Sequence, residues 1–314
     1  MATTTQRIQL GIPTLAGLEA HVGNTPLLPL AHIGSGLRQG VQLLAKAEWF
    51  NPGGSVKDRP ALNIIRCAIE NGQLGYGKRL LDSTSGNMGI AYATFCAPLG
   101  IPVTLVVPAN ASPERIAILK ALGAQIVLSD PLEGSDGALQ QARKMAAEDP
   151  QRYFYANQYD NPANWEAHYW TTGPEIWKQT GGTVTHFVAG LGTSGTLTGV
   201  GRALREYAPT IRLIAVQPDQ PMHGLEGLKH MPTALRPGIY DPAFPDAIIE
   251  VKTEAAYEMV RRLGREEGLF VGISSGAAAW AALQVAASLE AGTVVTLFPD
   301  AGYKYLSDQK IWEG

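Results

Sequence analysis

Short apolar runs alternate with amphipathic segments along the chain, and this alternation constrains the fold more than any other feature of the sequence. The amphipathic segments repeat apolar residues at helical spacing, as Leu62, Ile65 and Ile69 do. Strands that alternate with helices form largely parallel sheets covered by helices on both faces. We therefore expect an α/β protein with strands at 41–48, 79–82, 103–107, 125–129, 153–156, 186–189, 212–216, 247–251 and 294–299.

Nine strands in 314 residues predict two three-layer α/β/α domains with mostly parallel sheets. Residues 51–161 are predicted to form the smaller domain and 1–50 plus 162–314 the larger one, with the active site in a cleft between them. Ser112-Pro113-Glu114 has the residues of a helix start. Further helices are expected at 61–70, 88–99, 196–207, 254–267 and 274–289.

The charge and hydropathy of the chain argue against several partners. A formal net charge of -3 gives no electrostatic reason to expect nucleic acid or an anionic membrane. The uncharged stretch 83–113 could mimic a membrane span, but Pro98 and Pro102 interrupt it, and a buried helix followed by a buried strand explains it better. The first residues lack a basic region followed by an apolar core, so we expect no secretory signal and a cytoplasmic location.

The cysteines and histidines predict neither a disulfide nor a metal site. Cys67 and Cys96, the only cysteines, fall in apolar helical patterns and are interpreted as core residues. The six histidines show no metal-like pairing, so no metal is expected. His168, in an aromatic-rich helix, is interpreted as a core or surface residue.

A glycine-rich loop at 190–196, Gly-Leu-Gly-Thr-Ser-Gly-Thr, follows one predicted strand and opens a predicted helix. Glycines let backbone amides converge on an anion, hydroxyls add donors, and the helix N-terminus adds a favourable dipole. A phosphate fits such a loop, although a tight strand-to-helix turn is the alternative interpretation. The spacing is that of neither a P-loop nor a dinucleotide-binding loop.

Two further loops stand between a predicted strand and a predicted helix. Lys57 lies in the loop 51–59, where partial burial would lower the pKa of its amine and make it available for imine formation. The loop 83–87, Ser-Thr-Ser-Gly-Asn, offers hydroxyls, an amide and helix-start N–H groups to a carboxylate, or else a simple helix cap by Ser or Asn. A phosphate cup, an amine and a carboxylate site at the carboxyl ends of strands are together what pyridoxal 5'-phosphate (PLP) and an amino-acid substrate need.

The loops 51–59, 84–87, 190–196 and 272–276 occur in the order and spacing of a known family. In these motifs the chain resembles the cysteine synthase (O-acetylserine sulfhydrylase) family, within the β-family of fold-type II PLP enzymes, whose fold is that of the tryptophan synthase β-subunit. The resemblance covers nearly the whole chain, and the stretches 171–177 and 217–240 look like isozyme B.

The resemblance implies roles for individual residues. Lys57 matches the catalytic lysine that binds the cofactor and moves the α-proton, Asn87 the partner of the ring hydroxyl, and Ser274 the partner of the pyridine nitrogen. Thr84, Ser85 and Gln158 match groups that hold the substrate carboxylate, to which Asn87 also belongs. The phosphate loop matches Gly192, Thr193, Ser194, Gly195 and Thr196.

Three departures from the family pattern bear on the substrates. Met88 stands where the family usually has threonine, so one hydroxyl for the carboxylate is absent. Lys229 retains a cation in a stretch where isozyme B has two arginines and a tryptophan, which keeps an anionic sulfur donor such as thiosulfate open. Asp219 lies where phosphoserine-using relatives place an arginine, which disfavours O-phosphoserine because a carboxylate repels phosphate.

The resemblance implies β-replacement on an O-activated L-serine, foremost O-acetyl-L-serine. A sulfur nucleophile, sulfide or thiosulfate, would give L-cysteine or S-sulfocysteine through an α-aminoacrylate intermediate, in a homodimer that acts on small molecules. O-phosphoserine sulfhydrylase and cystathionine β-synthase activities are alternatives. A regulatory binding partner without catalysis is a further alternative, against which the intact Lys57 argues.

Overall fold

The computed structural model describes residues 17–75 and 77–313. Contacts within the chain divide it into two compact units: unit 1 comprises Met1–Val22 and Ala61–Asn157, and unit 2 comprises Gly23–Pro60 and Gln158–Gly314. The domains predicted from the sequence are bounded at other residues, and the cleft between them stays a prediction. The N-terminal residues on which the expected lack of a secretory signal rests lie outside the described residues.

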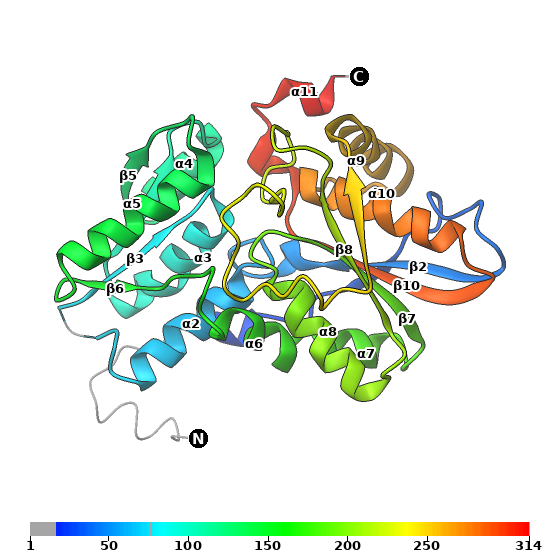
Figure 1. Cartoon of the computed structure of the whole chain (residues 1–314), viewed down its shortest axis with the longest axis horizontal. Helices are drawn as coiled ribbons and strands as arrows, with labels where there is room; N and C mark the ends of the chain where they lie inside the picture. The colour runs from blue at the N-terminus through cyan, green and yellow to red at the C-terminus, as the bar shows by residue number, and fades with distance from the viewer. Residues whose placement is uncertain (1–16, 76, 314) are drawn as a thin grey trace. The chain divides into compact units, whose positions relative to one another are not determined.

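Unit 2 is built on a six-stranded sheet in the order β1-β2-β10-β7-β8-β9 (Figure 1). Every neighbouring pair of strands is parallel except β1 with β2. The sequence did not predict β1, because three residues are too few to show a pattern. The strands are β1 (Leu27–Pro29), β2 (Gly40–Ala47), β7 (Val184–Gly190), β8 (Arg212–Pro218), β9 (Ala247–Val251) and β10 (Ala291–Phe298).

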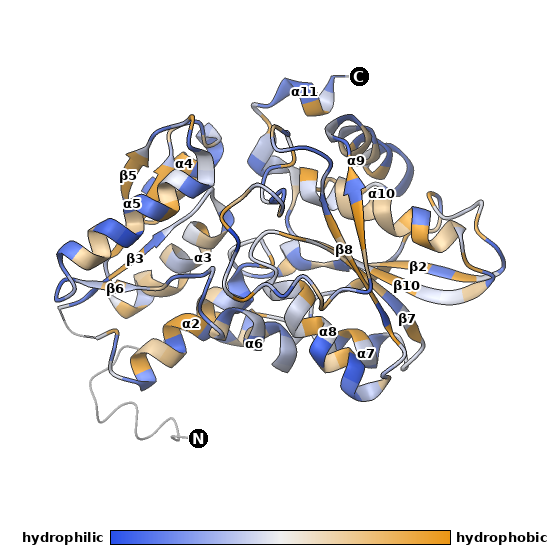
Figure 2. Ribbon diagram, viewed as in Figure 1, coloured by the Kyte–Doolittle hydropathy of each residue, from blue (hydrophilic) through white to orange (hydrophobic). Residues whose placement is uncertain are grey.

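Successive residues of the central strands point to opposite faces of this sheet, which makes unit 2 a three-layer structure. Val294 of β10 packs into one core with residues of α9 and α10, whereas its neighbour Val295 packs into a second core with residues of α7 and α8. Figure 2 accordingly shows β7 and β8 as mainly hydrophobic, as strands buried on both faces should be. The helices are α6 (Ala163–Trp170), α7 (Thr172–Gln179), α8 (Gly195–Tyr207), α9 (Thr253–Glu267), α10 (Ile273–Ala287) and α11 (Gln309–Trp312), with 3-10 helices η2 (Glu48–Phe50) and η4 (Gly302–Tyr305).

Unit 1 holds a four-stranded, wholly parallel sheet in the order β5-β4-β3-β6 (Figure 1). Ala138 of α5 packs against Leu81 and Val106 on one face, and Gly89 of α3 lies against Leu105, which points to the other face. The strands are β3 (Arg79–Ser83), β4 (Val103–Pro108), β5 (Gln125–Ser129) and β6 (Tyr153–Tyr155). The helices are η1 (Leu18–His21), α3 (Asn87–Cys96), η3 (Ala97–Leu99), α4 (Pro113–Ala121) and α5 (Gly134–Glu148), while α2 (Asp58–Glu70) begins in unit 2 and continues in unit 1.

The predicted fold class is confirmed, and each of the nine predicted strands is present: β5 and β9 have the predicted boundaries, and the others differ by one to three residues at an end. The helix predicted at 88–99 is wrong at its end, where α3 gives way to the 3-10 helix η3 because Pro98 lacks the N–H that an α-helix needs. Ser112 accepts a hydrogen bond from Arg115 N at 3.4 Å, as its predicted place before α4 requires. Within 17–75 and 77–313, the helices are all too short or too polar to cross a membrane.

Candidate active site

Lys57 lies in the turn between η2 and α2, at the carboxyl end of β10. Val56 N donates to Pro299 O at 2.8 Å, and Ser55 forms an isolated bridge with Asp300. The Lys57 side chain is half-buried, as the sequence predicted. Burial lowers the pKa of its ammonium, and the negative charge of Asp300 offsets part of this shift. The turn therefore presents an amine that loses its proton more easily than an ordinary lysine.

The first turn of α10 is fastened to the same strand end. Gly272 N donates to Asp300 O at 3.1 Å, and Val271 forms a bridge with Ala301. A Cβ on Gly272 would lie 2.2 Å from Asp300 Oδ1, so only glycine permits this approach. Ser274, the second residue of α10, is 6% exposed. The Lys57 turn and the Ser274 turn thus both adjoin Asp300.

The loop from β7 to α8 has the geometry of an anion cup. Ser194 has φ 70, a left-handed backbone that a non-glycine residue seldom adopts. A Cβ on Gly192 would lie 2.6 Å from Gly227 O, and one on Gly195 would lie 2.1 Å from Asn164 Oδ1. Both glycines are therefore required, and a helix start of this kind can offer backbone N–H groups to an anion.

Two other predicted residues lie beside this loop. Gln158 is 3% exposed, and its backbone O accepts a hydrogen bond from Asn164 Nδ2 at 2.7 Å. Lys229 is 6% exposed, and its backbone N donates to Leu191 O at 2.8 Å. Its ammonium stands 5.1 Å from the ring centroid of Tyr159, within cation–π range.

The predicted carboxylate-binding residues lie in unit 1, after the carboxyl end of β3. Thr84 Oγ1 accepts hydrogen bonds from Gly86 N at 2.9 Å and Gly89 N at 3.1 Å, so a threonine satisfies the start of α3. The alternative interpretation, a cap by Ser or Asn, is wrong because the capping position is Gly86. Ser85 and Asn87 are half-buried, and Ser85 O accepts from Arg115 Nη1 at 3.2 Å.

Known proteins are similar to this chain over most of its length. Residues 18–300 match the family described as pyridoxal-phosphate dependent enzyme. The chain belongs to this family. It is 52% identical over 291 residues to a cysteine synthase of Aquifex aeolicus, covering 91% of this chain and 89% of that one. It is 42% identical to a cysteine synthase B of Pseudomonas aeruginosa, covering 94% of this chain and 96% of that one. Its similarity extends to the crystal structure of a cysteine synthase from Entamoeba histolytica, with TM-score 0.88, 38% identity and coverage of 93% and 89%.

Membership in the pyridoxal-phosphate dependent enzymes identifies the cofactor, and unit 2 contains a cradle that fits its phosphate. Ser194 Oγ is buried without a hydrogen-bond partner among the described residues, which is costly unless a ligand supplies one. Gly192 and Gly195, which lie on either side of Ser194 in the sequence, allow the backbone of the loop to pack closely against its neighbours. Because β2, β7 and β10 are parallel, their carboxyl ends meet at one edge of the sheet, where Lys57 and this loop both lie.

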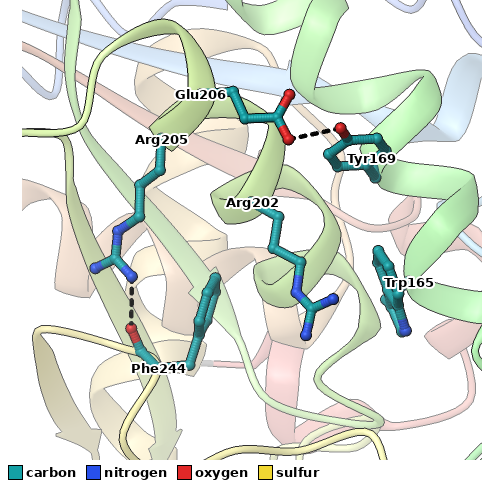
Figure 3. A pocket seen from close by; sticks show the side chains of 6 residues that line it. All are labelled: Trp165, Tyr169, Arg202, Arg205, Glu206 and Phe244. Atoms are coloured by element: carbon teal, nitrogen blue, oxygen red, sulfur yellow. Dashed lines mark hydrogen bonds between the residues drawn. The ribbon is translucent and has the colours of Figure 1, made fainter.

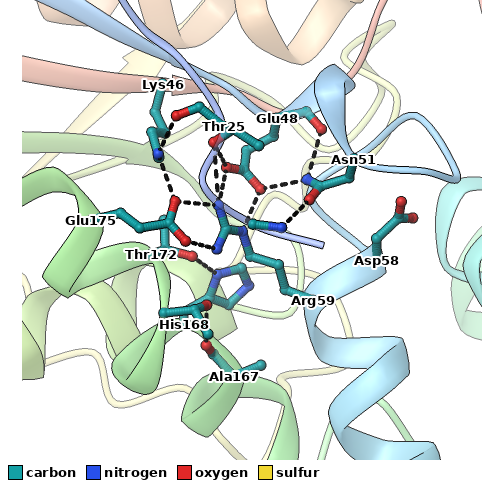
Figure 4. A network of polar contacts seen from close by, with 12 residues as sticks. Thr25, Lys46, Glu48, Asn51, Asp58, Arg59, Ala167, His168, Thr172 and Glu175 are labelled. Carbon is teal, nitrogen blue, oxygen red and sulfur yellow. Dashed lines mark hydrogen bonds and ion pairs between the residues drawn. The ribbon is translucent and has the colours of Figure 1, made fainter. Parts of the chain in front are cut away.

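A buried charge network that the sequence pattern did not predict surrounds the start of α2 (Figure 4). Arg59 pairs with Glu48 through Nε at 2.7 Å and Nη2 at 2.8 Å, and with Glu175 through Nη1 at 2.7 Å. Lys46 Nζ lies 2.7 Å from Glu175 Oε2, and Asn51 Nδ2 donates to Glu48 Oε2 at 2.9 Å. Asn51 and Arg59 bracket the Lys57 turn, so the network holds both ends of that turn.

The pKa values of the network carboxyls show that it is ionised. Burial alone would raise the pKa of Glu48, but the guanidinium of Arg59 outweighs burial and holds that pKa below its ordinary value. Burial would also raise the pKa of Glu175, but the hydrogen bonds and charges of Arg59 and Lys46 outweigh burial and lower that pKa to about 2. Proximity of Glu48 and Arg59 to the Lys57 motif was a signal in the sequence, whereas Glu175, 116 residues away from Arg59, gave none.

Unit 2 also has an open hollow on the outer side of α6 and α8, with a volume of about 530 Å³ (Figure 3). The guanidinium carbon of Arg202 lies 4.1 Å from the ring centroid of Trp165, and the hydroxyl of Tyr169 donates to Glu206 Oε1 at 2.6 Å. The hollow contains none of the predicted site residues. No group of three His, Cys, Asp or Glu side chains suited to a metal ion occurs among the described residues.

Proposed function

We propose that the protein catalyses PLP-dependent β-replacement on O-acetyl-L-serine, in which sulfide displaces acetate and L-cysteine is formed. The observation that carries the proposal is the position of a lysine with a lowered amine pKa and an anion cup at the same edge of one parallel sheet. The cysteine synthases to which the chain is similar support it. A homodimer in the cytoplasm, implied by the resemblance, is part of the proposal.

Bound PLP supplies an aldehyde that captures amines and a ring that acidifies the Cα–H bond of the captured amino acid. The amine of Lys57 would hold the cofactor until the substrate amine takes its place. The freed amine would then accept the proton from Cα as acetate leaves Cβ, and return it to Cα after the sulfur nucleophile has added at Cβ. Burial supports both roles because it lowers the pKa of this amine.

The other residues bind and orient. The loop 192–196 holds the phosphate through backbone N–H groups and hydroxyls. Ser274 meets the pyridine nitrogen with a neutral hydroxyl, which does not hold a proton there as a carboxylate would. Asn87 meets the ring hydroxyl, and Thr84, Ser85 and Gln158 hold the substrate carboxylate. Lys229, a buried cation, attracts an anionic sulfur donor.

Borohydride reduction followed by peptide mapping tests the lysine. We expect one labelled lysine, Lys57, and no label in Lys57→Ala. Lys304 is the internal control, because its buried ammonium lies beside the same turn, 3.0 Å from Gly54 O. Label on Lys304 or on no lysine would refute the assignment.

The substrates are tested in a comparison of O-acetylserine and O-phosphoserine, each with sulfide, thiosulfate or homocysteine. Cysteine formed fastest from O-acetylserine and sulfide supports the proposal, and S-sulfocysteine formation from thiosulfate would add the second donor. Faster turnover of homocysteine would instead favour the cystathionine β-synthase alternative. A labelled Lys57 without product from any pair would favour the regulatory binding partner.

A further inference from the structure

Asn164 and His168 of α6 contact the side-chain hydroxyls of the two threonines in the phosphate loop. Asn164 Nδ2 lies 3.1 Å from Thr193 Oγ1, and His168 Nε2 lies 3.3 Å from Thr196 Oγ1. Asn164 and His168 are four residues apart, so they share one side of the helix. Gly199 of α8 allows this proximity, because a Cβ there would lie 2.1 Å from a backbone oxygen of α6.

The hydrogen bonds that Thr193 accepts leave its hydroxyl hydrogen to be donated elsewhere. A hydroxyl has one hydrogen to donate and two lone pairs to accept. Thr193 Oγ1 accepts from Asn164 Nδ2 at 3.1 Å and from Gly195 N at 3.3 Å. The orientation of the Asn164 amide is fixed because the same Nδ2 donates to Gln158 O at 2.7 Å, and a carbonyl can only accept. Both lone pairs of Thr193 are therefore engaged by the protein.

His168 is held in one tautomer by Thr172. The imidazole is 1% exposed, and burial lowers its pKa to about 3, so it is neutral at physiological pH and carries one N–H. Its Nδ1 lies 2.9 Å from Thr172 Oγ1, a fully buried hydroxyl for which the described residues provide no other hydrogen-bond acceptor (Figure 4). If Nδ1 carried the proton, the hydroxyl hydrogen of Thr172 would be buried unpaired, which is unfavourable.

The tautomer of His168 determines how the hydroxyl of Thr196 is oriented. When Thr172 donates to Nδ1, the proton of the imidazole is on Nε2 and is donated to Thr196 Oγ1. Thr196 then accepts from the protein side and has its own hydrogen available for a ligand. With the opposite tautomer, Nε2 would accept that hydrogen, and Thr196 Oγ1 would turn only a lone pair toward the ligand.

We propose that Asn164 and His168 are positioning residues that orient the hydroxyls of Thr193 and Thr196 as hydrogen-bond donors toward the phosphate of the cofactor. The inference rests on the proposed assignment of the loop 192–196 to that phosphate. The segment 190–196 contains no lysine or arginine. The donors that this segment offers to the phosphate are therefore neutral ones and the helix N-terminus, and a hydroxyl turned the wrong way would repel the phosphate.

The tautomer is tested by ¹⁵N NMR of the histidines in the full-length protein, with and without cofactor, using His168→Gln to assign the signal. We expect a neutral His168 with its proton on Nε2 at pH 7. Thr172→Val should remove this preference and Thr172→Ser should keep it, because serine retains the hydroxyl. A proton on Nδ1 in the unaltered protein, or no change in Thr172→Val, would overturn the inference.

Cofactor affinity is tested by titrating the apo-protein with PLP and, in parallel, with pyridoxal, which lacks the phosphate. For His168→Leu and Thr172→Val we expect PLP to bind about ten- to hundred-fold more weakly, as loss of a hydrogen bond to a charged group predicts, with little change for pyridoxal. His168→Gln and Thr172→Ser, which keep a donor, should bind PLP close to normally. Equal losses for both ligands, or none, would refute the inference, while a borohydride-labelled Lys57 would leave the proposed function intact.

Discussion

Glu48→Gln should destabilise unit 2 far more than removal of one ordinary surface charge. The carboxylate of Glu48 is fully buried and accepts four hydrogen bonds: two from Arg59 at 2.7 and 2.8 Å, one from Thr25 at 2.7 Å and one from Asn51 at 2.9 Å. Lys46 and Arg59 balance Glu48 and Glu175 in charge, so glutamine would leave one buried positive charge uncompensated. Removing one partner of a buried ion pair costs about 3–5 kcal/mol.

The free energy of unfolding can be measured for unit 2 alone. The six tryptophans, at 49, 165, 170, 177, 280 and 312, all belong to unit 2. Urea unfolding followed by tryptophan fluorescence therefore reports on this unit, even where a chain of two units unfolds in more than one step. Glu266→Gln is the matched control, because Glu266 pairs with Arg262 at 2.7 Å on the exposed face of α9. Its removal should change the free energy of unfolding little, because an exposed ion pair is screened by solvent.

A double variant separates charge imbalance from loss of shape. Glu48→Gln with Arg59→Met restores the balance, because Lys46 and Glu175 remain as a pair at 2.7 Å. It should therefore be less destabilised than the sum of the two single variants. A Glu48→Gln protein as stable as Glu266→Gln would refute the reasoning that the buried charges are interdependent.

Two further predictions concern α6 and α8. Gly199→Ala should push the two helices apart, because its Cβ would lie 2.1 Å from a backbone oxygen of α6. We expect the free energy of unfolding in urea to fall by about 1–3 kcal/mol and PLP to bind more weakly. An unchanged affinity for PLP would contradict the coupling of α6 to the phosphate loop. The pKa of His168 is lowered from 6.5 to about 3 on folding, so its contribution to stability is present above pH 6.5 and is lost as pH falls toward 3. Between pH 6 and 4 the unaltered protein should lose stability about 1.4 kcal/mol per pH unit faster than His168→Gln, and parallel pH profiles would show that the imidazole is not held neutral.

The elements that the sequence predicted are those whose signal is local. β7 and α8 were recognisable because a buried apolar run is followed by glycines and then by a helical repeat, and all three cues lie within a few residues. The same holds for Lys57, whose motif lies between a strand and a helix. The role of each residue in the motifs came from the family resemblance, because spacing alone left a tight turn or a helix cap as alternatives.

The features that the sequence did not predict depend on partners far apart in the chain. Glu175 and Lys46 are distant in sequence, and a lone charge in a helix pattern does not reveal that it is buried and paired. His168 was interpreted as a core or surface residue, and it is indeed buried, but only the folded structure shows Thr172 on one ring nitrogen and Thr196 on the other. Long-range polar contacts of this kind leave no periodic trace in the sequence.

The neutral character of the phosphate loop explains why these long-range contacts matter for Lys57. An arginine or lysine at the phosphate would add a positive charge near the edge of the sheet where Lys57 lies. That charge would lower the pKa of the Lys57 amine further, by an amount that depends on the distance between the two groups. Here burial sets the lowered pKa of Lys57, moderated by Asp300 alone. A loop without charged side chains leaves that balance intact, but it binds phosphate only if each hydroxyl points the right way. The contacts from α6 would then allow oriented neutral donors to replace a cationic phosphate site, while the buried charges of Lys46 and Arg59 remain paired with Glu48 and Glu175.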